Sequence, residues 1–350
     1  MGNKKVLVGI SGGVDSAVSA LLLKNAGYDV IGVTLEMFTN NDEKQSYDDA
    51  KNICDDLGIP HYVFDYKDEF QDRVIEDFAK CYLDCKTPNP CIECNKYLKF
   101  GAMFEKAKEL GCVYIATGHY AKTEYSEKYG RWVLKKSNAG RKDQSYVLWS
   151  IPKEKLEYIL FPLDNFENKD EIRKIASDNK LRVAIKPDSE DICFIPDGDY
   201  KKFLEENNFI KPKKGNIIHI DGTVLGKHNG LYNYTIGQRK GLGIAYKNPL
   251  FVLGFDKEKN AVIVGEQEYL LKKEIYVTDL NLLLVDEIEE NMEVTVKTRY
   301  SSKEAKAKLN MVSKDILKIT FDEAQRAITP GQSAVMYVDD IVLGGGKIIK

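Results

Sequence analysis

The sequence predicts an α/β domain with a doubly wound parallel sheet, followed by a small mixed domain and a C-terminal antiparallel β-barrel. Up to about residue 205, short apolar runs alternate with amphipathic helical patterns, which is typical of a parallel sheet. From residue 217 onward, runs rich in Val, Ile, Thr and Tyr are separated by Gly, Asn and Asp, which is typical of small antiparallel sheets. A chain of 350 residues is also long enough for two or three domains. We therefore expect domains at residues 1–206, 207–272 and 273–350.

In the first part, four strands and four helices are expected. The strands are short and mostly apolar, as buried strands are, and lie at residues 5–10, 30–35, 62–64 and 112–116. The helices show apolar residues at helical spacing, and a Gly follows three of them; they lie at residues 15–26, 47–57, 68–82 and 95–110. In the second part, the clearest strands are expected at residues 251–255, 261–264, 292–299 and 316–321.

Composition and charge exclude several classes of protein. Lys plus Arg number 51 and Asp plus Glu number 54, so the formal net charge of −3 excludes a uniformly basic nucleic-acid binder, although not a local basic face. The longest apolar run has five residues, whereas a membrane-spanning helix needs about 20. The N-terminus lacks the pattern of a signal peptide. We therefore expect a cytoplasmic protein without a membrane partner.

Residues 11–16 (SGGVDS) lie between the first predicted strand and the first predicted helix. Gly12 and Gly13 allow the backbone to approach an anion closely, and the free N–H groups of the helix N-terminus point at it. Asp15 within such a loop repels phosphate unless Mg²⁺ bridges the two. The loop is neither a Walker A loop nor a GxGxxG fingerprint. A plain tight turn with a serine cap is the alternative, but the carboxylate and the position after the first strand favour a nucleotide site.

Seven cysteines in a chain of this size are expected to be core residues, metal ligands or redox groups rather than disulfide staples. Cys91 and Cys94 form a CxxC pair after a proline-rich loop, and we place Cys94 at a helix start, where the helix dipole favours a thiolate. Cys193 is a third candidate, and these three thiols could together hold an iron–sulfur cluster with one open iron. The remaining cysteines are expected to be structural: Cys54 and Cys112 in the core, and Cys81 and Cys85 on one helix face.

Several longer motifs carry a resemblance to a known family. The chain resembles the tRNA-specific 2-thiouridylases (the MnmA or TrmU family), whose catalytic domain is a PP-loop ATPase of the N-type ATP pyrophosphatases, with a fold like that of the adenine nucleotide alpha hydrolases. The matching motifs lie at residues 9–16 (GISGGVDS), 87–96 (TPNPCIECNK), 116–120 (ATGHY), 142–146 (KDQSY), 188–195 (DSEDICFI), 222–243, 299–300 and 330–332.

The resemblance implies that ATP and Mg²⁺ bind at the loop and that Asp15 is catalytic. The wobble uridine of a tRNA is implied to be flipped in, so that its C2 oxygen attacks the α-phosphate and pyrophosphate leaves. The residues implied to bind ATP are Gly9, Ile10, Ser11, Gly12, Gly13, Val14, Asp15, Ser16, Leu35 and Gly118.

The resemblance also implies the route of the sulfur. Cys193 matches the cysteine that carries a persulfide, and Cys94 matches its catalytic partner, so a sulfur-carrier or relay protein is implied as the donor. Part of the family has Asp in place of Cys91, which leaves open whether sulfur passes as a persulfide or through an iron–sulfur cluster. The residues implied to contact tRNA are Asn89, Pro90, Cys91, His119, Lys142, Asp143, Gln144, Arg299, Tyr300 and Gln332.

Two alternatives stay open from the sequence. One is another PP-loop adenylating enzyme, such as an amidotransferase-type synthetase or a different tRNA thiolase, in which Cys193 is not essential. The other is a non-enzymatic RNA-binding protein with a vestigial loop, in which replacing Asp15 has no effect. The intact SGGVDS sequence argues against the second.

Overall fold

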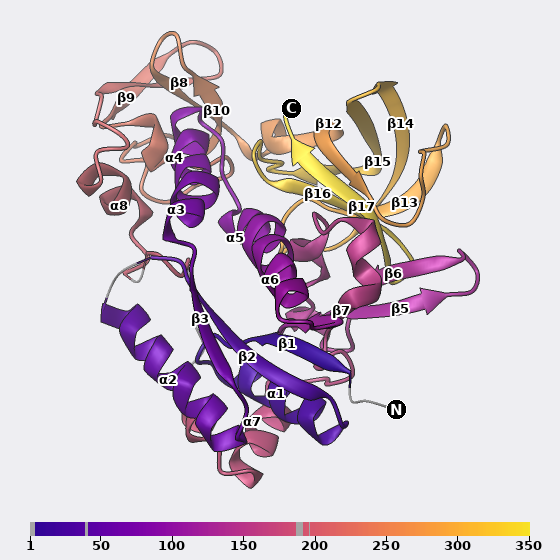
Figure 1. The fold of residues 1–350 in the computed structure, drawn as a ribbon. Helices are drawn as coiled ribbons and strands as arrows, with labels where there is room; N and C mark the ends of the chain where they lie inside the picture. Colours follow the sequence, from indigo (N-terminus) through magenta and orange to yellow (C-terminus); the bar gives the residue numbers. More distant parts are fainter. Residues whose placement is uncertain (1–3, 39–40, 187–191, 196) are drawn as a thin grey trace.

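Three β-sheets make up the fold (Figure 1). The computed structural model describes residues 4–38, 41–186, 192–195 and 197–350. The parallel sheet lies in the lower half of the view, and the two antiparallel sheets lie above it on either side. The expected fold class is confirmed: a parallel α/β sheet, a small middle sheet and a closed antiparallel barrel.

The parallel sheet has the strand order β3-β2-β1-β4-β7. Its strands are β1 (Lys5–Gly9), β2 (Asp29–Glu36), β3 (His61–Asp65), β4 (Tyr114–Ala116) and β7 (Ile159–Leu160). Val6, Leu7 and Val8 of the central strand have no exposed surface, as expected for a strand covered on both faces. The chain runs from β1 outward to β3 and then returns to the other side of β1. Ligands of such sheets bind where the strand order reverses, at the carboxyl ends of β1 and β4.

The predicted helices are confirmed; the second and the fourth begin six and five residues earlier than predicted, and the other bounds differ by at most one residue. They are α1 (Val14–Asn25), α2 (Asn41–Leu57), α3 (Lys67–Phe70) continuing into α4 (Glu76–Leu83), and α5 (Pro90–Cys94) continuing into α6 (Met103–Glu109). The last two are not regular throughout, because the π-helices η1 (Gln71–Ile75) and η2 (Asn95–Ala102) join their halves. Beyond the four predicted helices, α7 (Lys169–Asp178) and α8 (Tyr200–Glu206) follow in the chain.

The middle sheet and the barrel contain the predicted β-rich runs. The middle sheet has the order β10-β11-β8-β9, from β8 (Gly215–His219), β9 (Val224–His228), β10 (Phe251–Asp256) and β11 (Ala261–Gly265). Pairing of the first barrel strand with the last closes the barrel. Its strands are β12 (Leu271–Leu282), β13 (Met292–Lys297), β14 (Ala305–Ser313), β15 (Ile316–Arg326), β16 (Ser333–Val338) and β17 (Ile341–Ile348).

A hairpin from the first part of the chain joins the barrel sheet, which the sequence did not predict. Its strands are β5 (Lys122–Ser126) and β6 (Arg131–Lys135), and Lys135 pairs with Ile341 of β17. Val133 packs into the barrel core, so this hairpin ties the α/β part to the barrel (Figure 1).

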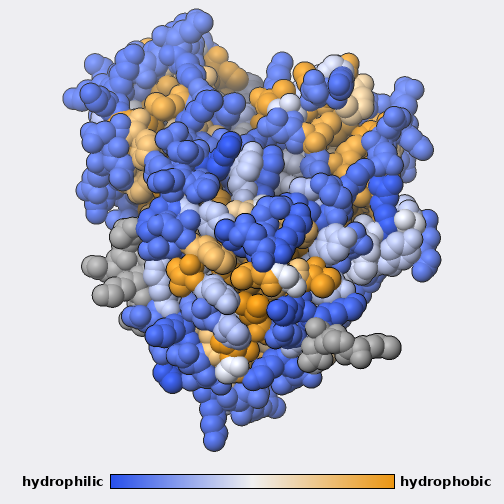
Figure 2. All heavy atoms as spheres, viewed as in Figure 1, coloured by the Kyte–Doolittle hydropathy of each residue, from blue (hydrophilic) through white to orange (hydrophobic). Residues whose placement is uncertain are grey.

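Most of the face in Figure 2 is hydrophilic; hydrophobic residues gather near and below its centre, and further groups lie at the upper left and upper right, over the middle sheet and the barrel. A cleft of about 580 Å³ in the fold is lined by Phe104, Val113 and Tyr158, among others. Val113 directly precedes β4, so the cleft lies at the amino end of that strand, away from the edge where ligands bind. Among the described helices, none has the length and apolar composition that a membrane span requires.

Candidate nucleotide and thiol site

The loop between β1 and α1 forms a cradle of backbone groups. Gly12 has a φ of +72°, and a Cβ there would lie 2.6 Å from the carbonyl oxygen of Ser46, so only glycine fits. Gly13 is the N-cap of α1 and offers no side chain, which leaves the first N–H groups of the helix without a side-chain cap. Ser16 Oγ donates to the Gly13 carbonyl (3.0 Å) and accepts from Ser11 N–H (3.2 Å). Such a cradle at a helix N-terminus fits a phosphate group.

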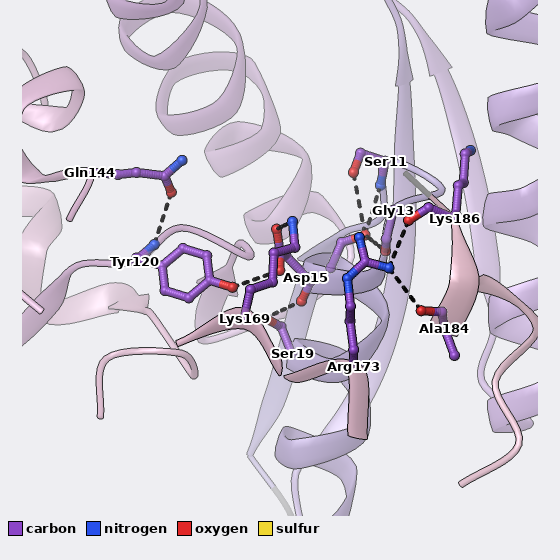
Figure 3. A network of polar contacts seen from close by, with 11 residues as sticks. Ser11, Gly13, Asp15, Ser19, Tyr120, Gln144, Lys169, Arg173, Ala184 and Lys186 are labelled. Carbon is purple, nitrogen blue, oxygen red and sulfur yellow. Dashed lines mark hydrogen bonds and ion pairs between the residues drawn. The ribbon is translucent and has the colours of Figure 1, made fainter. Parts of the chain in front are cut away.

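Asp15 is held by two partners from distant segments (Figure 3). Its Oδ1 accepts a hydrogen bond from the Tyr120 hydroxyl (2.8 Å), and its Oδ2 forms an ion pair with Lys169 Nζ (2.8 Å). Tyr120 N–H in turn donates to Gln144 Oε1 (2.9 Å). Lys169 is the first residue of α7, and nothing in the sequence pointed to it or to Tyr120 as a partner of Asp15. The ammonium of Lys169 already compensates the carboxylate that sequence reasoning assigned to Mg²⁺ alone.

The carboxyl end of β4 packs directly against the loop. A Cβ at Gly118 would lie 2.8 Å from the Asp15 carbonyl carbon and 2.9 Å from Ser16 N, so a side chain there would displace the loop. His119 follows, and its Nδ1 lies 2.8 Å from Thr117 Oγ1. Burial holds the pKa of His119 well below its usual range, and the charge of Lys99 lowers it further, so the ring is neutral at pH 7.

The placement of Cys94 at a helix start is wrong. The helix begins at Pro90, after Asn89, and Cys94 is the fifth helical residue, 6% exposed. Its Sγ lies 3.8 Å from the Met37 sulfur, just beyond the end of β2. Burial raises the pKa of the thiol to about 11, so desolvation outweighs any help from the helix dipole. Cys91 is the residue in the first turn, and it is exposed.

Cys193 joins this group from the segment 192–195. The residue as a whole is exposed, yet the pKa of its thiol is raised to about 12. Desolvation of the sulfur is the main cause, and the charges of Cys94 and Cys91 raise the pKa further. The three thiols therefore lie close enough to act on one another. All three are free, and in the described parts of the chain no three His, Cys, Asp or Glu side chains are grouped as a metal site. Residues 188–191 of the predicted motif lie outside the described residues.

Aromatic packing anchors Cys193 through its neighbour. Phe194 is 5% exposed, and its ring lies 5.6 Å from Phe70, 5.4 Å from Phe78 and 5.3 Å from Phe203, between centroids. Three elements, α3, α4 and α8, thus hold one side chain of a short segment.

The barrel braces the loop that precedes Cys91. Gln332 Nε2 donates to the carbonyl groups of Thr87 and Pro88, both at 3.0 Å. Thr87 N–H donates to the Pro330 carbonyl (2.9 Å). Lys347 of β17 forms an ion pair of 2.9 Å with Glu93, which is mostly buried in α5. The barrel and the α/β part therefore share the positioning of the CxxC segment.

The remaining predicted contact residues are partly engaged inside the protein. Arg299 Nη2 donates to the carbonyl groups of Ile236 (3.3 Å) and Ala327 (2.7 Å) and to the Thr329 hydroxyl. The Asp143 carboxylate is buried, and it accepts from Ser137 N–H and the Ser145 hydroxyl.

The other predicted residues lie at varied depths. Tyr300 packs edge-on against Tyr146 with 6.1 Å between centroids, and Lys142 is exposed. Leu35 is buried near the carboxyl end of β2.

Comparisons with known proteins cover almost the whole chain. Three family descriptions match in succession: "tRNA methyl transferase HUP domain" at residues 4–197, "tRNA methyl transferase PRC-barrel domain" at 201–266 and "Aminomethyltransferase beta-barrel domain" at 272–348. Proteins of Clostridioides difficile and Acetivibrio thermocellus, both named tRNA-specific 2-thiouridylase MnmA, are 46% identical. These matches cover 99% of this chain, and 99% and 100% of those proteins.

Solved structures match more weakly. One is the U34-tRNA thiolase NcsA from Methanococcus maripaludis with its [4Fe-4S] cluster, at 20% identity and a TM-score of 0.36. The match covers 59% of the present chain and 68% of the NcsA chain. A likeness at this level carries no argument about a cluster in this chain.

Proposed function

The chain belongs to the family of tRNA-specific 2-thiouridylases, which are tRNA sulfurtransferases, and from this premise we propose how its own residues replace the C2 oxygen of a wobble uridine with sulfur. The substrates are ATP, a tRNA with a uridine at the wobble position, and sulfur delivered as a persulfide by a carrier or relay protein. The reaction takes place in the cytoplasm.

Adenylation takes place at the phosphate cradle. The uncapped N–H groups of α1 and the backbone of Gly12 and Gly13 hold the phosphates of ATP. The uridine C2 oxygen attacks the α-phosphorus, the bond from that phosphorus to the bridging oxygen breaks, and pyrophosphate leaves. Asp15 is the carboxylate that would hold Mg²⁺, a hard cation that prefers oxygen ligands and neutralises phosphate charge.

Sulfur transfer takes place at the thiols. The terminal sulfur of a Cys193 persulfide attacks C2, and the C2–O bond breaks with its electron pair leaving on AMP. The Cys94 thiolate, whose proton goes to solvent, attacks Cys193 Sγ. The bond from Sγ to the transferred sulfur breaks, and the electron pair stays on that sulfur, which becomes the 2-thio group. The two cysteines are oxidised to a disulfide while the transferred sulfur is reduced, and a dithiol reductant restores them.

One observation supports this assignment most: the phosphate cradle and the thiols lie at the same edge of one parallel sheet. The cradle follows β1, Met37 beside Cys94 follows β2, and Gly118 against the cradle follows β4. A base flipped into this edge can meet ATP and sulfur without moving between sites. We propose that Asn89, Pro90 and Cys91 touch the target base. We propose further that the tRNA is contacted by His119, Lys142, Asp143, Gln144, Arg299, Tyr300 and Gln332.

We keep a cluster-dependent route as the second candidate, in which Cys91, Cys94 and Cys193 would hold an iron–sulfur cluster with one open iron. Against it, no three His, Cys, Asp or Glu side chains of the described residues are grouped as a metal site. We also propose three domains: a catalytic domain at residues 1–206, a central adaptor domain that binds tRNA at residues 207–272, and a β-barrel domain at residues 273–350.

The test is direct. The full chain is incubated with ATP, glutathione persulfide, dithiothreitol and an unmodified transcript of a tRNA with a wobble uridine. We expect a band retarded in a mercury-containing gel, together with release of pyrophosphate. Release of pyrophosphate without any retarded band would leave the protein as another adenylating enzyme.

A further inference from the structure

Lys99 has a half-buried side chain and lies five residues after Cys94, in the π-helix that Cys94 caps. For the part of the chain that the structure describes, neither a hydrogen bond nor an ion pair of its ammonium is found. Its charge is therefore available to an anion that comes and goes. We propose that Lys99 is a positioning residue of sulfur transfer, whose ammonium stabilises negative charge on the sulfur atoms of Cys94 and Cys193. This inference rests on the proposed function.

The π-helix η2 places Lys99 beside Cys94. Cys94 is the N-cap of η2, and in a π-helix each N–H bonds to the carbonyl five residues earlier, so residues five apart stack one turn above another. In an α-helix the same spacing would turn Lys99 about 140° away from Cys94. Gly101 permits this winding, since a Cβ there would lie 2.9 Å from the Lys96 carbonyl oxygen. The irregularity thus brings a cation and a thiol to one side of the helix.

The electrostatics agree with this placement. For both Cys94 and Cys193, burial is the main cause that raises the thiol pKa, and Lys99 is the side-chain charge that opposes it. The same charge lowers the pKa of His119, which follows the Gly118 that packs on the phosphate cradle. The charge of Lys99 therefore reaches both thiols and His119.

The chemistry at the thiols needs such a cation. Negative charge sits on the persulfide sulfur of Cys193 when it attacks C2, and on Cys94 Sγ when it attacks Cys193 Sγ to form the disulfide and release the 2-thio group. Cys94 is buried, so water offers its thiolate little stabilisation, and desolvation also raises the pKa of the Cys193 thiol. No atom is exchanged with Lys99, which changes only the free energy of the anions.

The test compares Lys99→Met, which removes the charge and keeps the stem, with Lys99→Arg, which keeps the charge. We expect Lys99→Met to release pyrophosphate within about twofold of the wild type but to form 2-thiouridine about tenfold more slowly, because loss of the charge raises the pKa of both thiols. The rate of iodoacetamide alkylation at Cys94 and Cys193, followed by mass spectrometry without substrates, should fall by a similar factor. Lys99→Arg should restore most of both rates.

Lys108→Met is the matched control, because Lys108 is exposed on α6, where it forms an ion pair with Glu105 and lies over the Phe104 ring. It should behave as the wild type. Lys99→Gln serves if the Met variant does not fold. Normal thiolation and alkylation in Lys99→Met would overturn the proposal, as would an equal loss of both half-reactions without rescue by Arg. If the wild type forms no 2-thiouridine, the proposed function fails, while the alkylation rates still decide on Lys99.

Discussion

The phosphate cradle and the thiol cluster share one sheet edge but are built in opposite ways. The cradle consists of the backbone of one continuous segment between β1 and α1, and its serines bond within that segment. The thiol cluster consists of side chains from α5 and from residues 192–195, packed against Met37 and braced by the barrel. Local sequence therefore determines the first site, whereas the second exists only when distant parts have folded together.

The largest expected effect is at the thiols. Cys94→Ser and Cys193→Ser should each abolish 2-thiouridine formation while pyrophosphate release continues, because the thiols act after adenylation. Under the persulfide route Cys91→Ser should be mild. An inactive Cys91→Ser variant, together with stoichiometric iron and sulfide in the anaerobically prepared wild type, would establish the cluster route instead. Loss of activity in a folded Cys54→Ala or Cys112→Ala would show that the thiols chosen are the wrong ones.

Asp15→Ala should impair adenylation at the phosphate cradle and leave the thiol cluster unaffected. We expect pyrophosphate release to fall about 1,000-fold, as when one preorganised charged group is removed from a reaction centre, while tRNA binding changes little. Asp170→Ala, an exposed carboxylate on the neighbouring α7, is the control. Near-normal pyrophosphate release by Asp15→Ala would mean that the loop is not catalytic.

Phe194→Leu should weaken the packing that holds Cys193 in place without changing any cysteine. A displacement of Cys193 by about 1 Å would slow sulfur transfer up to about 100-fold, while adenylation stays nearly unchanged. Phe203→Leu removes packing from the same aromatic cluster but is not adjacent to Cys193, so it should affect stability more than transfer. Equal kinetic effects of the two variants would show that Phe194 only stabilises the fold.

Binding of tRNA should depend strongly on salt despite the net charge of −3. Contacts to phosphates release counterions, so we expect affinity to fall at least about tenfold between roughly 50 and 200 mM salt. Lys142→Ala should reduce the slope of log K against log salt by about one. A flat response in filter binding would mean that the basic loop around residue 142 is only solvated surface.

Gln332→Ala should have the smallest effect, through loss of the two hydrogen bonds from the barrel to the loop that precedes Cys91. Two carbonyl groups lose their donor, which should lower the free energy of unfolding by about 2 kcal/mol and slow thiolation a few-fold. Gln325→Ala is the control, because Gln325 Nε2 bonds only to the nearby Glu323 carbonyl. Thermal unfolding and the mercury gel measure both quantities. A normal rate in Gln332→Ala would mean that the CxxC loop holds its position without the barrel.

The same contrast explains what could be predicted. The strand, loop and helix of the cradle were predicted because apolar runs and glycines encode them locally. The hairpin of β5 and β6 was missed because its partner β17 lies about 200 residues away, and the alternating Lys, Glu and Tyr of 122–126 resemble an exposed loop. The π-helices were missed because helical periodicity tolerates one extra residue in a turn.

Within the site, the side-chain partners escaped sequence reasoning. Lys169, Tyr120 and Lys99 act through contacts across the fold, and no spacing in the sequence marks them. Cys193 was singled out from the sequence as a candidate thiol, but its role as the persulfide carrier came only from a resemblance to known proteins. Cys94 was placed correctly in the chain but wrongly in its helix, because Pro90 starts the helix one turn earlier.

The brace from the barrel joins the CxxC loop to a part of the chain that is synthesised much later. Gln332 follows Thr87 by 245 residues, and Lys347 comes later still. Because chains fold from the N-terminus as they leave the ribosome, the nucleotide cradle forms while the barrel is still being translated. A nascent chain thus forms the loop between β1 and α1 well before the segment that precedes Cys91 is braced, since a fragment that ends before Gln332 lacks the donor to the carbonyl groups of Thr87 and Pro88.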